Sequence, residues 1–431
     1  MAARLDMNSG AFAKDFRALL DAKREASADV EAAVRAIVAD VAARGDDAVK
    51  DHTRKFDRCD LDRTGLKVTA DEIVAAVKLC SPATLDALEL ARARIEAYHR
   101  RQVPADDRYV DQLGVELGSR WTAIEAVGLY VPGGSAAYPS SVLMNAVPAK
   151  VAGVPRLVMA VPAPGGELNP LVLAAAKLAG IDEIFRIGGA QAIAALAYGT
   201  KTIAPVAKIV GPGNAYVAAA KRMVFGKVGI DTIAGPSEVL ILADGDSNAD
   251  WIAADLLAQA EHDASAQAIL ITDSAALAER VERAVAAQLA ALPRGKVAGA
   301  SWRDYGAVIL VPTLDQALPL IDVLAPEHVE IAAADGERFA QGIRNAGAIF
   351  LGPHTPEAIG DYIAGSNHVL PTARAARFSS GLGVLDFVKR TSILKCGPEQ
   401  LALLGPAAMA LGEAEGLAAH ARSVAIRLNR R

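Results

Sequence analysis

Apolar and polar positions divide the chain into a helical first part and two later series of short strands and helices. In residues 30–44, 70–79 and 83–103, apolar side chains recur three or four positions apart, which is typical of amphipathic helices. A looser alternation over residues 114–125 predicts a hairpin. We therefore expect residues 11–103 to be mainly helical and a small β element to follow them.

From residue 127 onward, short apolar runs bounded by Gly and Pro alternate with alanine-rich segments of helical period. The first series predicts strands at 127–131, 157–161, 183–187 and 207–210, with helices at 141–153, 168–179, 190–198 and 214–225. The second series predicts strands at 239–243, 268–272, 307–311, 328–332 and 348–351, with helices at 248–262, 274–291, 314–325 and 336–346. Strands that alternate with helices form mostly parallel sheets covered on both faces. The pattern therefore predicts an α/β fold with two such units.

Two joins rich in Gly and Pro, residues 131–134 and 234–236, are the expected crossings between the units. The first unit is accordingly interpreted as an insertion in a larger one. Beyond about residue 380 the pattern shows no further series of strands, and residues 407–429 form a last helical region. Such a tail buries little surface by itself. We expect it to pack on the main body or on a neighbouring subunit.

Length and charge narrow the class of protein. A chain of 431 residues exceeds one ordinary core, which favours two large domains. The net charge of −5 and the lack of a long basic run argue against a nucleic-acid partner. Three widely spaced cysteines without a C-x-x-C pair are typical of a reducing compartment. Because the sequence shows neither a signal-like N-terminus nor an apolar run of bilayer length, we predict a cytoplasmic protein without membrane contact.

Three loops that contain glycine each follow an expected strand and precede an expected helix, at residues 130–134, 187–191 and 210–216. In an open α/β sheet such loops line the ligand crevice and present backbone N–H groups to a phosphate. One loop alone is commonly a simple turn, and none has the G-x-G-x-x-G spacing, but three in one unit favour a nucleotide or phosphate site. Three polar side chains beside them are candidates to bind a ribose, phosphate or base edge: Tyr130, Gln191 and Asn214.

A second group of polar residues lies in the other unit and in the tail. The stretch 255–263, D-L-L-A-Q-A-E-H-D, places Gln259 and His262 on one helical face, although by itself it is also typical of a solvated surface. Glu327 and His328 stand side by side before an expected strand, where they suit general acid–base chemistry. Further candidates lie beside the second join, in a long polar segment and in the tail: Ser237, His354, Glu357, Asp361, Asn367, His368, Glu415 and His420.

The seven histidines of the chain are unevenly placed. His52 and His99 lie among charged residues in the N-terminal part, where we expect them on the surface. The other five fall in the polar segments. This clustering favours a metal site with nitrogen and oxygen ligands, since Zn²⁺ binds both imidazole and carboxylate. The spacing alone does not decide which of these side chains meet.

Six ordered motifs resemble those of the histidinol dehydrogenase family, along nearly the whole chain. They are Y-V-P-G-G-x-A-x-Y-P-S-S-V-L-M-N at 130–145, I-V-G-P-G-N-A-Y-V at 209–217, D-x-I-A-G-P-S-E-V at 231–239, Q-A-E-H-D at 259–263, A-P-E-H-V-E at 325–330 and G-S-N-H-V-L-P-T at 365–372, the last followed by F-S-S-G-L at 378–382. The resemblance implies an NAD-dependent zinc enzyme that oxidises L-histidinol through L-histidinaldehyde to L-histidine, in the last steps of histidine biosynthesis.

The same resemblance implies a domain organisation. We expect an α/β fold of two incomplete Rossmann-like parallel-sheet domains with helices on both faces, plus small N- and C-terminal helical extensions. The expected domains are an N-terminal helical extension (1–24), a larger α/β domain (25–129 with 238–381), an NAD-binding α/β domain (130–237) and a C-terminal tail (382–431). The tail would reach the partner of a homodimer whose active site is shared.

The resemblance also implies roles for individual residues. The implied catalytic residues are Glu327 and His328. The implied zinc ligands are Gln259, His262, Asp361 and His420, with His420 supplied by the other subunit. The implied NAD contacts are Tyr130, Gln191 and Asn214. The implied substrate contacts are Ser237, Gln259, His262, His328, Asp361, His368, Glu415 and His420.

One other interpretation stays open at this point, and two more are disfavoured. A relative of the family could oxidise another small polyol, such as a sulfonated diol, with the same zinc and NAD chemistry. A non-enzymatic nucleotide-binding module with a structural zinc is disfavoured, because structural zinc sites are usually closed and rich in cysteine. A covalent route through a cysteine thiohemiacetal is disfavoured as well, because all three cysteines lie outside the motifs.

Overall fold

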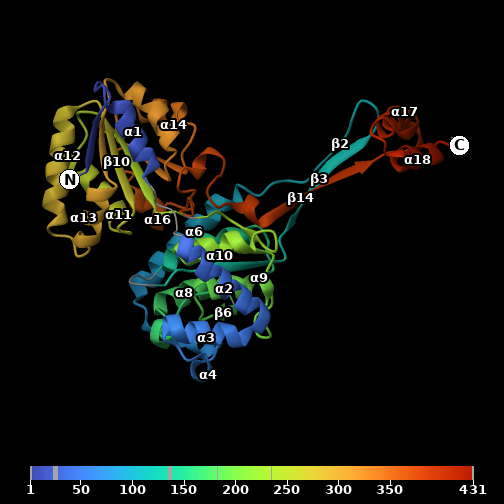
Figure 1. Cartoon of the computed structure of the whole chain (residues 1–431), viewed down its shortest axis with the longest axis horizontal. Helices are drawn as coiled ribbons and strands as arrows, with labels where there is room; N and C mark the ends of the chain where they lie inside the picture. The colour runs from blue at the N-terminus through green and yellow to red at the C-terminus, as the bar shows by residue number, and fades with distance from the viewer. Residues whose placement is uncertain (1, 23–27, 134–137, 182, 234, 430–431) are drawn as a thin grey trace.

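Two α/β lobes and a slender arm make up the molecule in the computed structural model, which describes residues 2–22, 28–133, 138–181, 183–233 and 235–429 (Figure 1). The N-terminus lies in one lobe, and the C-terminus lies at the far end of the arm. None of the helices in the described residues combines the length and the apolar character needed to span a bilayer.

A six-stranded parallel sheet forms the centre of the first lobe. In spatial order its strands are β1 (Ala3–Asp6), β11 (Ala307–Leu310), β10 (Gln267–Thr272), β9 (Glu238–Ala243), β12 (His328–Ile331) and β13 (Ala348–Leu351). One face is covered by α11 (Ala249–Ala260), α12 (Ala275–Leu289) and α13 (Gly295–Asp304). The other face is covered by α1 (Phe12–Asp21), α14 (Leu318–Leu324) and α15 (Gly336–Gly342). With both faces covered, β9, β10 and β11 consist mainly of continuous apolar runs rather than alternating ones.

A five-stranded parallel sheet forms the centre of the second lobe, with the strand order β6 (Glu183–Phe185), β5 (Arg156–Ala160), β4 (Ala126–Tyr130), β7 (Lys208–Val210) and β8 (Gly229–Ile230). One face is covered by α2 (Ala28–Arg44), α3 (Asp46–Asp57), α9 (Gly189–Tyr198) and α10 (Ala215–Val224). The other face is covered by α5 (Ala70–Leu79), α6 (Pro82–Arg100), α7 (Pro139–Val151) and α8 (Pro170–Leu178). The short helix α4 (Leu61–Thr64) follows α3.

The arm combines distant parts of the sequence. Strands β2 (Asp107–Val110), β3 (Glu116–Ala123) and β14 (Val388–Lys395) form an antiparallel sheet with β3 in the middle. Helices α17 (Pro398–Ala414) and α18 (Ala418–Arg427) pack on each other beyond it, away from both lobes in Figure 1. Residues 114–125, predicted as a hairpin, hold the single strand β3, and its hairpin partner β2 precedes that range. Strand β14 was not predicted in the tail.

The predicted α/β class with helices on both faces of parallel sheets is confirmed, but the grouping of the elements differs from the predicted domains. Residues 3–6 form an edge strand of the six-stranded sheet instead of a purely helical extension. Residues 28–100 cover the five-stranded sheet, where Val34 and Val49 share a core with Ile193. The join at 131–134 is therefore no crossing, because β4 and α7 on either side of it belong to one lobe; Gly134 and Ala234 of the two joins lie outside the described residues.

The surface prediction for His99 is wrong. Its side chain is fully buried on α6, and Nδ1 donates a hydrogen bond to the backbone oxygen of Ile95 at 2.7 Å. Burial lowers the pKa of His99 below its usual 6.5. His52 is partly exposed and lies 2.9 Å from Asp40 Oδ2. The prediction relied on the charged residues next to His99 in sequence. On a helix, however, neighbouring residues point to different faces, so these charges say little about the burial of His99.

Candidate active site

The candidate site lies near the short connection between the two sheets. Strand β8 ends at Ile230 and β9 begins at Glu238, so only seven residues connect the carboxyl end of one sheet to the amino end of the other. A chain of that length spans at most about 25 Å. The glycine-containing loops follow carboxyl ends in the five-stranded sheet, and His328 begins a strand next to β9. The connection therefore brings the two groups of polar residues toward one another.

His328 is the centre of the site. It is 3% exposed, and its Nδ1 donates a hydrogen bond to the backbone oxygen of Glu238 at 2.9 Å. A carbonyl has no proton to give, so this contact places the ring proton on Nδ1 and the lone pair on Nε2. Nε2 is buried without a hydrogen-bond partner within the described residues. Burial lowers the pKa of His328 to about 3, so the ring is neutral with an open acceptor nitrogen.

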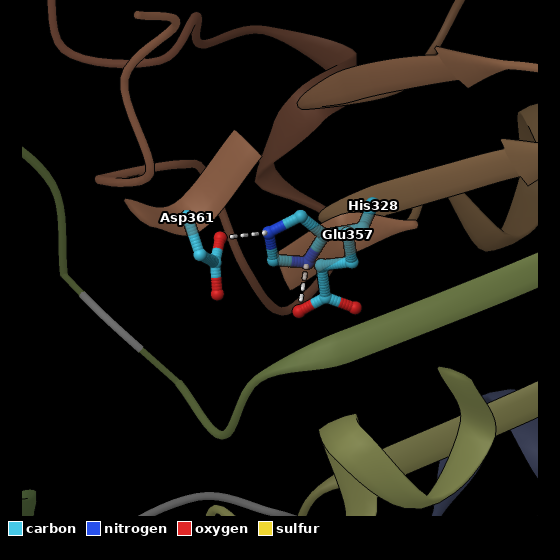
Figure 2. Close-up of side chains that lie close together, drawn as sticks. All are labelled: His328, Glu357 and Asp361. Atoms are coloured by element: carbon cyan, nitrogen blue, oxygen red, sulfur yellow. Dashed lines mark ion pairs between the residues drawn. The ribbon is translucent and has the colours of Figure 1, made fainter. Parts of the chain in front are cut away.

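Two carboxyl groups from α16 (Glu357–Tyr362) flank the ring of His328 (Figure 2). Glu357 and Asp361 are one helical turn apart, and so they share a face. Glu357 Oε1 lies 3.6 Å from His328 Nδ1, and Asp361 Oδ1 lies 3.7 Å from Nε2. The ligand atoms of these three residues all lie within 4.8 Å of one another. The arrangement is a candidate metal site.

Glu327 is also placed beside His328 by the structure. Its Oε2 lies 3.7 Å from His328 Nδ1 and accepts a hydrogen bond from the backbone N–H of Glu238 at 3.0 Å. Burial, together with the charges of Glu238 and Asp361, raises its pKa well above the usual value of 4.5. A carboxyl group with a raised pKa suits proton transfer near neutral pH.

Five carboxyl groups lie in or behind this cluster, of which Glu327, Glu330 and Glu357 are buried and Asp255 and Asp361 are partly buried. Burial raises the pKa of Asp255 to about 6, that of Asp361 to about 7 and that of Glu330 to about 8. Burial, and then the neighbouring carboxylates, also raises the pKa of Glu357 well above its usual value. No Lys or Arg in the described part of the chain forms an ion pair with any of the five. A bound cation fits this donor set, because it would offset the repulsion.

Gln259 and His262 approach the cluster from α11. Gln259 is fully buried, and with its amide nitrogen turned toward Glu357 it donates to Oε1 at 2.8 Å. His262 follows the end of α11, and much of its surface is exposed to solvent. Partial desolvation of its ring by the surrounding protein nevertheless lowers its pKa. His368 Nδ1 donates to the backbone oxygen of Asp361 at 2.9 Å, and its Nε2 lies 3.5 Å from Ser141 Oγ. Burial lowers the pKa of His368 to about 4.

Two of the predicted residues are not brought to the cluster within one chain. Glu415 and His420 are both exposed, and they belong to the helical tip of the arm, away from the lobes (Figure 1). Ser237 is partly buried next to Glu238 at the start of β9. His354 lies outside the cluster and packs its ring 5.3 Å from that of Trp251.

The three candidate cofactor residues lie at carboxyl ends of the five-stranded sheet. Its chain order changes direction between β4 and β7, and such switch points hold the ligand crevice of doubly wound sheets. Tyr130 ends β4, and its hydroxyl accepts a hydrogen bond from Gly189 N at 3.1 Å, while burial raises its pKa to about 12. Gln191 is buried on α9. Asn214 caps α10 by accepting from the N–H groups of Tyr216 and Val217.

Glu238 and Glu330 are site residues that the sequence interpretation missed. Both are buried in the six-stranded sheet, and Glu330 accepts a hydrogen bond from Glu357 N at 2.6 Å. Their signal was present, since each is a carboxylate inside an apolar strand run, where a charge is costly unless it has a role or a partner.

Comparison with known proteins identifies the family and supports the fold. The sequence model described as histidinol dehydrogenase matches residues 20–428. The histidinol dehydrogenase of Rhodopseudomonas palustris is 73% identical over 431 residues and covers 100% of both chains, and that of Nitrobacter winogradskyi is 73% identical over 429 residues with the same coverage. The crystal structure of histidinol dehydrogenase from Elizabethkingia anophelis shares 35% identity and a TM-score of 0.94, covering 99% of this chain and 98% of that chain. The chain belongs to the histidinol dehydrogenase family.

Proposed function

We propose that the chain oxidises L-histidinol to L-histidine through L-histidinaldehyde, with two NAD⁺ as hydride acceptors. The observation that carries the proposal is the buried, neutral ring of His328, whose Nε2 has no hydrogen-bond partner within the described residues. An unprotonated nitrogen without a partner can take the proton of an alcohol while hydride leaves to the nicotinamide, and the three carboxyl groups within 3.7 Å of the ring would stabilise it once it is protonated. Membership of the histidinol dehydrogenase family supports L-histidinol as this alcohol.

The second oxidation requires water. The aldehyde is first hydrated to a gem-diol, and loss of hydride from the carbon of that hydrate gives the carboxylic acid. Glu327 is suited to activate that water, since its carboxyl group lies beside His328 and its pKa is raised. His328 then accepts the proton of the hydrate hydroxyl, and the second hydride leaves to a second NAD⁺. The products of the whole sequence are the carboxylate, two NADH and three protons.

Zinc is the cation that we propose for the acidic cluster, with Gln259, His262 and Asp361 of one chain and His420 of a second chain as its ligands. When bound, zinc would hold and orient the nitrogen atoms of the substrate. The carboxyl groups of the cluster, which pair with no Lys or Arg among the residues that the structure describes, support a cation here. Asp361 is also a member of the candidate site with His328 and Glu357. We assign His328 to proton transfer rather than to the metal, because the metal would occupy the nitrogen that takes the proton.

A homodimer would complete this site. Four apolar side chains of the arm, Val110, Leu394, Leu403 and Leu411, keep 64–69% of their surface exposed. Apolar side chains at this density on a slender arm are typical of a surface that another subunit covers. Covering them with a second chain would also give Glu415 and His420 an active site to enter. The cytoplasmic location and the lack of nucleic-acid and membrane partners stay predictions.

Counting the NADH formed per substrate tests the proposed function. Purified protein is supplied with NAD⁺, zinc and a limiting amount of L-histidinol. About two NADH per histidinol is the expected yield, since each oxidation transfers one hydride. No NADH, or NADH only from a sulfonated diol offered in parallel, would contradict the proposed substrate.

A further inference from the structure

A buried ion pair lies in the five-stranded lobe, and neither of its residues belongs to the acidic cluster around His328. Lys221 is on α10 and Asp231 follows β8, and their side chains are 2% and 3% exposed. They form an ion pair with each other. A lysine is almost never buried to this degree without a partner.

Both charges also bind the backbone of one glycine. Asp231 Oδ2 accepts a hydrogen bond from Gly211 N at 2.8 Å, and Lys221 Nζ donates to Gly211 O at 3.1 Å. Gly211 has a φ of +112°, and a Cβ at this position would come within 2.1 Å of Tyr130 O. The orientation of both peptide groups of Gly211 is thus fixed: Asp231 binds the N–H group and Lys221 binds the C=O group.

The cost of burying such a pair indicates that it does more than stabilise the lobe. Replacing a buried ion pair by apolar residues of similar size is often neutral or stabilising. Apolar residues, however, cannot bind an N–H and a C=O group. The specific effect of Lys221 and Asp231 is therefore on the path of the loop that contains Gly211.

This loop lies at the switch point between β4 and β7 and leads into α10 through Asn214. We propose that Lys221 and Asp231 are positioning residues that hold the loop, residues 211–214, in the conformation that receives the diphosphate and ribose of NAD⁺. The proposal rests on the NAD-dependent function proposed above. Lys221 also offsets the charge of Asp231, which would otherwise repel the diphosphate of the cofactor.

Three variants separate this role from folding. Lys221→Met alone leaves a buried, unpaired carboxylate, whereas Lys221→Met with Asp231→Asn removes both charges and one of the two contacts to Gly211. Lys208→Met is the matched control, because Lys208 lies on β7, leads to the same loop and pairs with Asp386 without contact to Gly211. The dissociation constant of NAD⁺ is measured by titration calorimetry, and the KM values of NAD⁺ and L-histidinol are measured separately.

The double variant is expected to weaken NAD⁺ binding about tenfold or more, with an unchanged KM for L-histidinol and unchanged zinc content. The control is expected to bind NAD⁺ as the wild type does. Wild-type affinity for NAD⁺ in a folded double variant, or an equal rise of both KM values, overturns the proposal. If the double variant does not fold, Lys221→Arg keeps the charge and displaces the donor, and it must raise the KM of NAD⁺ alone. Wild-type protein that fails to bind NAD⁺ would instead overturn the proposed function.

Discussion

Glu327→Gln is expected to separate the two oxidations. The substitution nearly preserves the shape of the side chain, and the amide oxygen of Gln can still accept the hydrogen bond that Glu238 N gives at 3.0 Å. It removes a buried carboxyl group whose pKa is already raised by burial, so the change in the free energy of unfolding is expected to stay within about 1 kcal/mol. The fold and the cluster around His328 should remain intact.

The kinetic effect follows from the role of a general base. Such a group contributes roughly 10²- to 10⁴-fold, or about 3 to 5 kcal/mol of activation free energy. We expect this full loss in the oxidation of L-histidinaldehyde, which needs an activated water. Oxidation of L-histidinol to the aldehyde uses His328 alone, and its rate is expected to fall less than about tenfold.

The assay compares NADH formation from the alcohol in a single turnover with NADH formation from added aldehyde. Glu330→Gln serves as the control, because it removes another buried carboxyl group that accepts a hydrogen bond from Glu357 N. The control is expected to affect both steps alike. An equal loss in both steps for Glu327→Gln would refute its role in activating water.

Three further predictions concern the metal, the dimer and pH. His262→Asn is expected to lose zinc, whereas His328→Asn is expected to keep zinc and lose about 10²-fold or more in rate; metal analysis of both proteins would contradict the ligand set if His328→Asn lost the zinc instead. Inactive His420→Asn and His328→Asn chains, unfolded and refolded together, should regain up to about a quarter of the wild-type activity, because half of the dimers would contain one intact site of two; no recovery despite mixed dimers would place His420 in its own chain's site. Since burial lowers the pKa of His99, its contribution to stability is present above its unfolded pKa and is lost as the pH falls below 6.5. Urea unfolding of wild type and His99→Gln should therefore diverge with rising pH, and parallel curves would remove His99 as the cause.

Periodicity predicted the parallel strands of both lobes except the edge strands β1 and β8, because each predicted strand is a short apolar run between turn residues. It could not group the helices correctly, since an apolar helix face fits either sheet equally well before the chain is folded. Strand β14 escaped prediction for a related reason. Its sequence V-K-R-T-S-I-L-K has little apolar alternation, and its partner β3 lies far away in the sequence.

The polar residues of the site were predicted in part. Gln259, Glu327 and His328 lie in motifs shared with a known family, and the structure brings them together with Asp361, which lies outside those motifs. Lys221 and Asp231 could not be predicted, because a lysine on an alanine-rich helix is ordinarily a solvated residue. Only the fold shows that both side chains are buried against Gly211.

Two features of the single chain are physically unfavourable, and together they indicate what completes it. The first is the group of carboxyls around His328, whose pKa values burial raises and, for Glu327, Glu330 and Glu357, neighbouring carboxylates raise further. The second is the arm. Its Leu403 and Leu411 are exposed to water, and the helices that carry Glu415 and His420 lie away from both lobes. A cation alone would offset the first, and a partner alone would cover the second. If the arm of a partner brings His420 to the cation, one assembly step relieves both, and zinc content should then fall together with dimerisation when Leu403 and Leu411 are replaced by Asp.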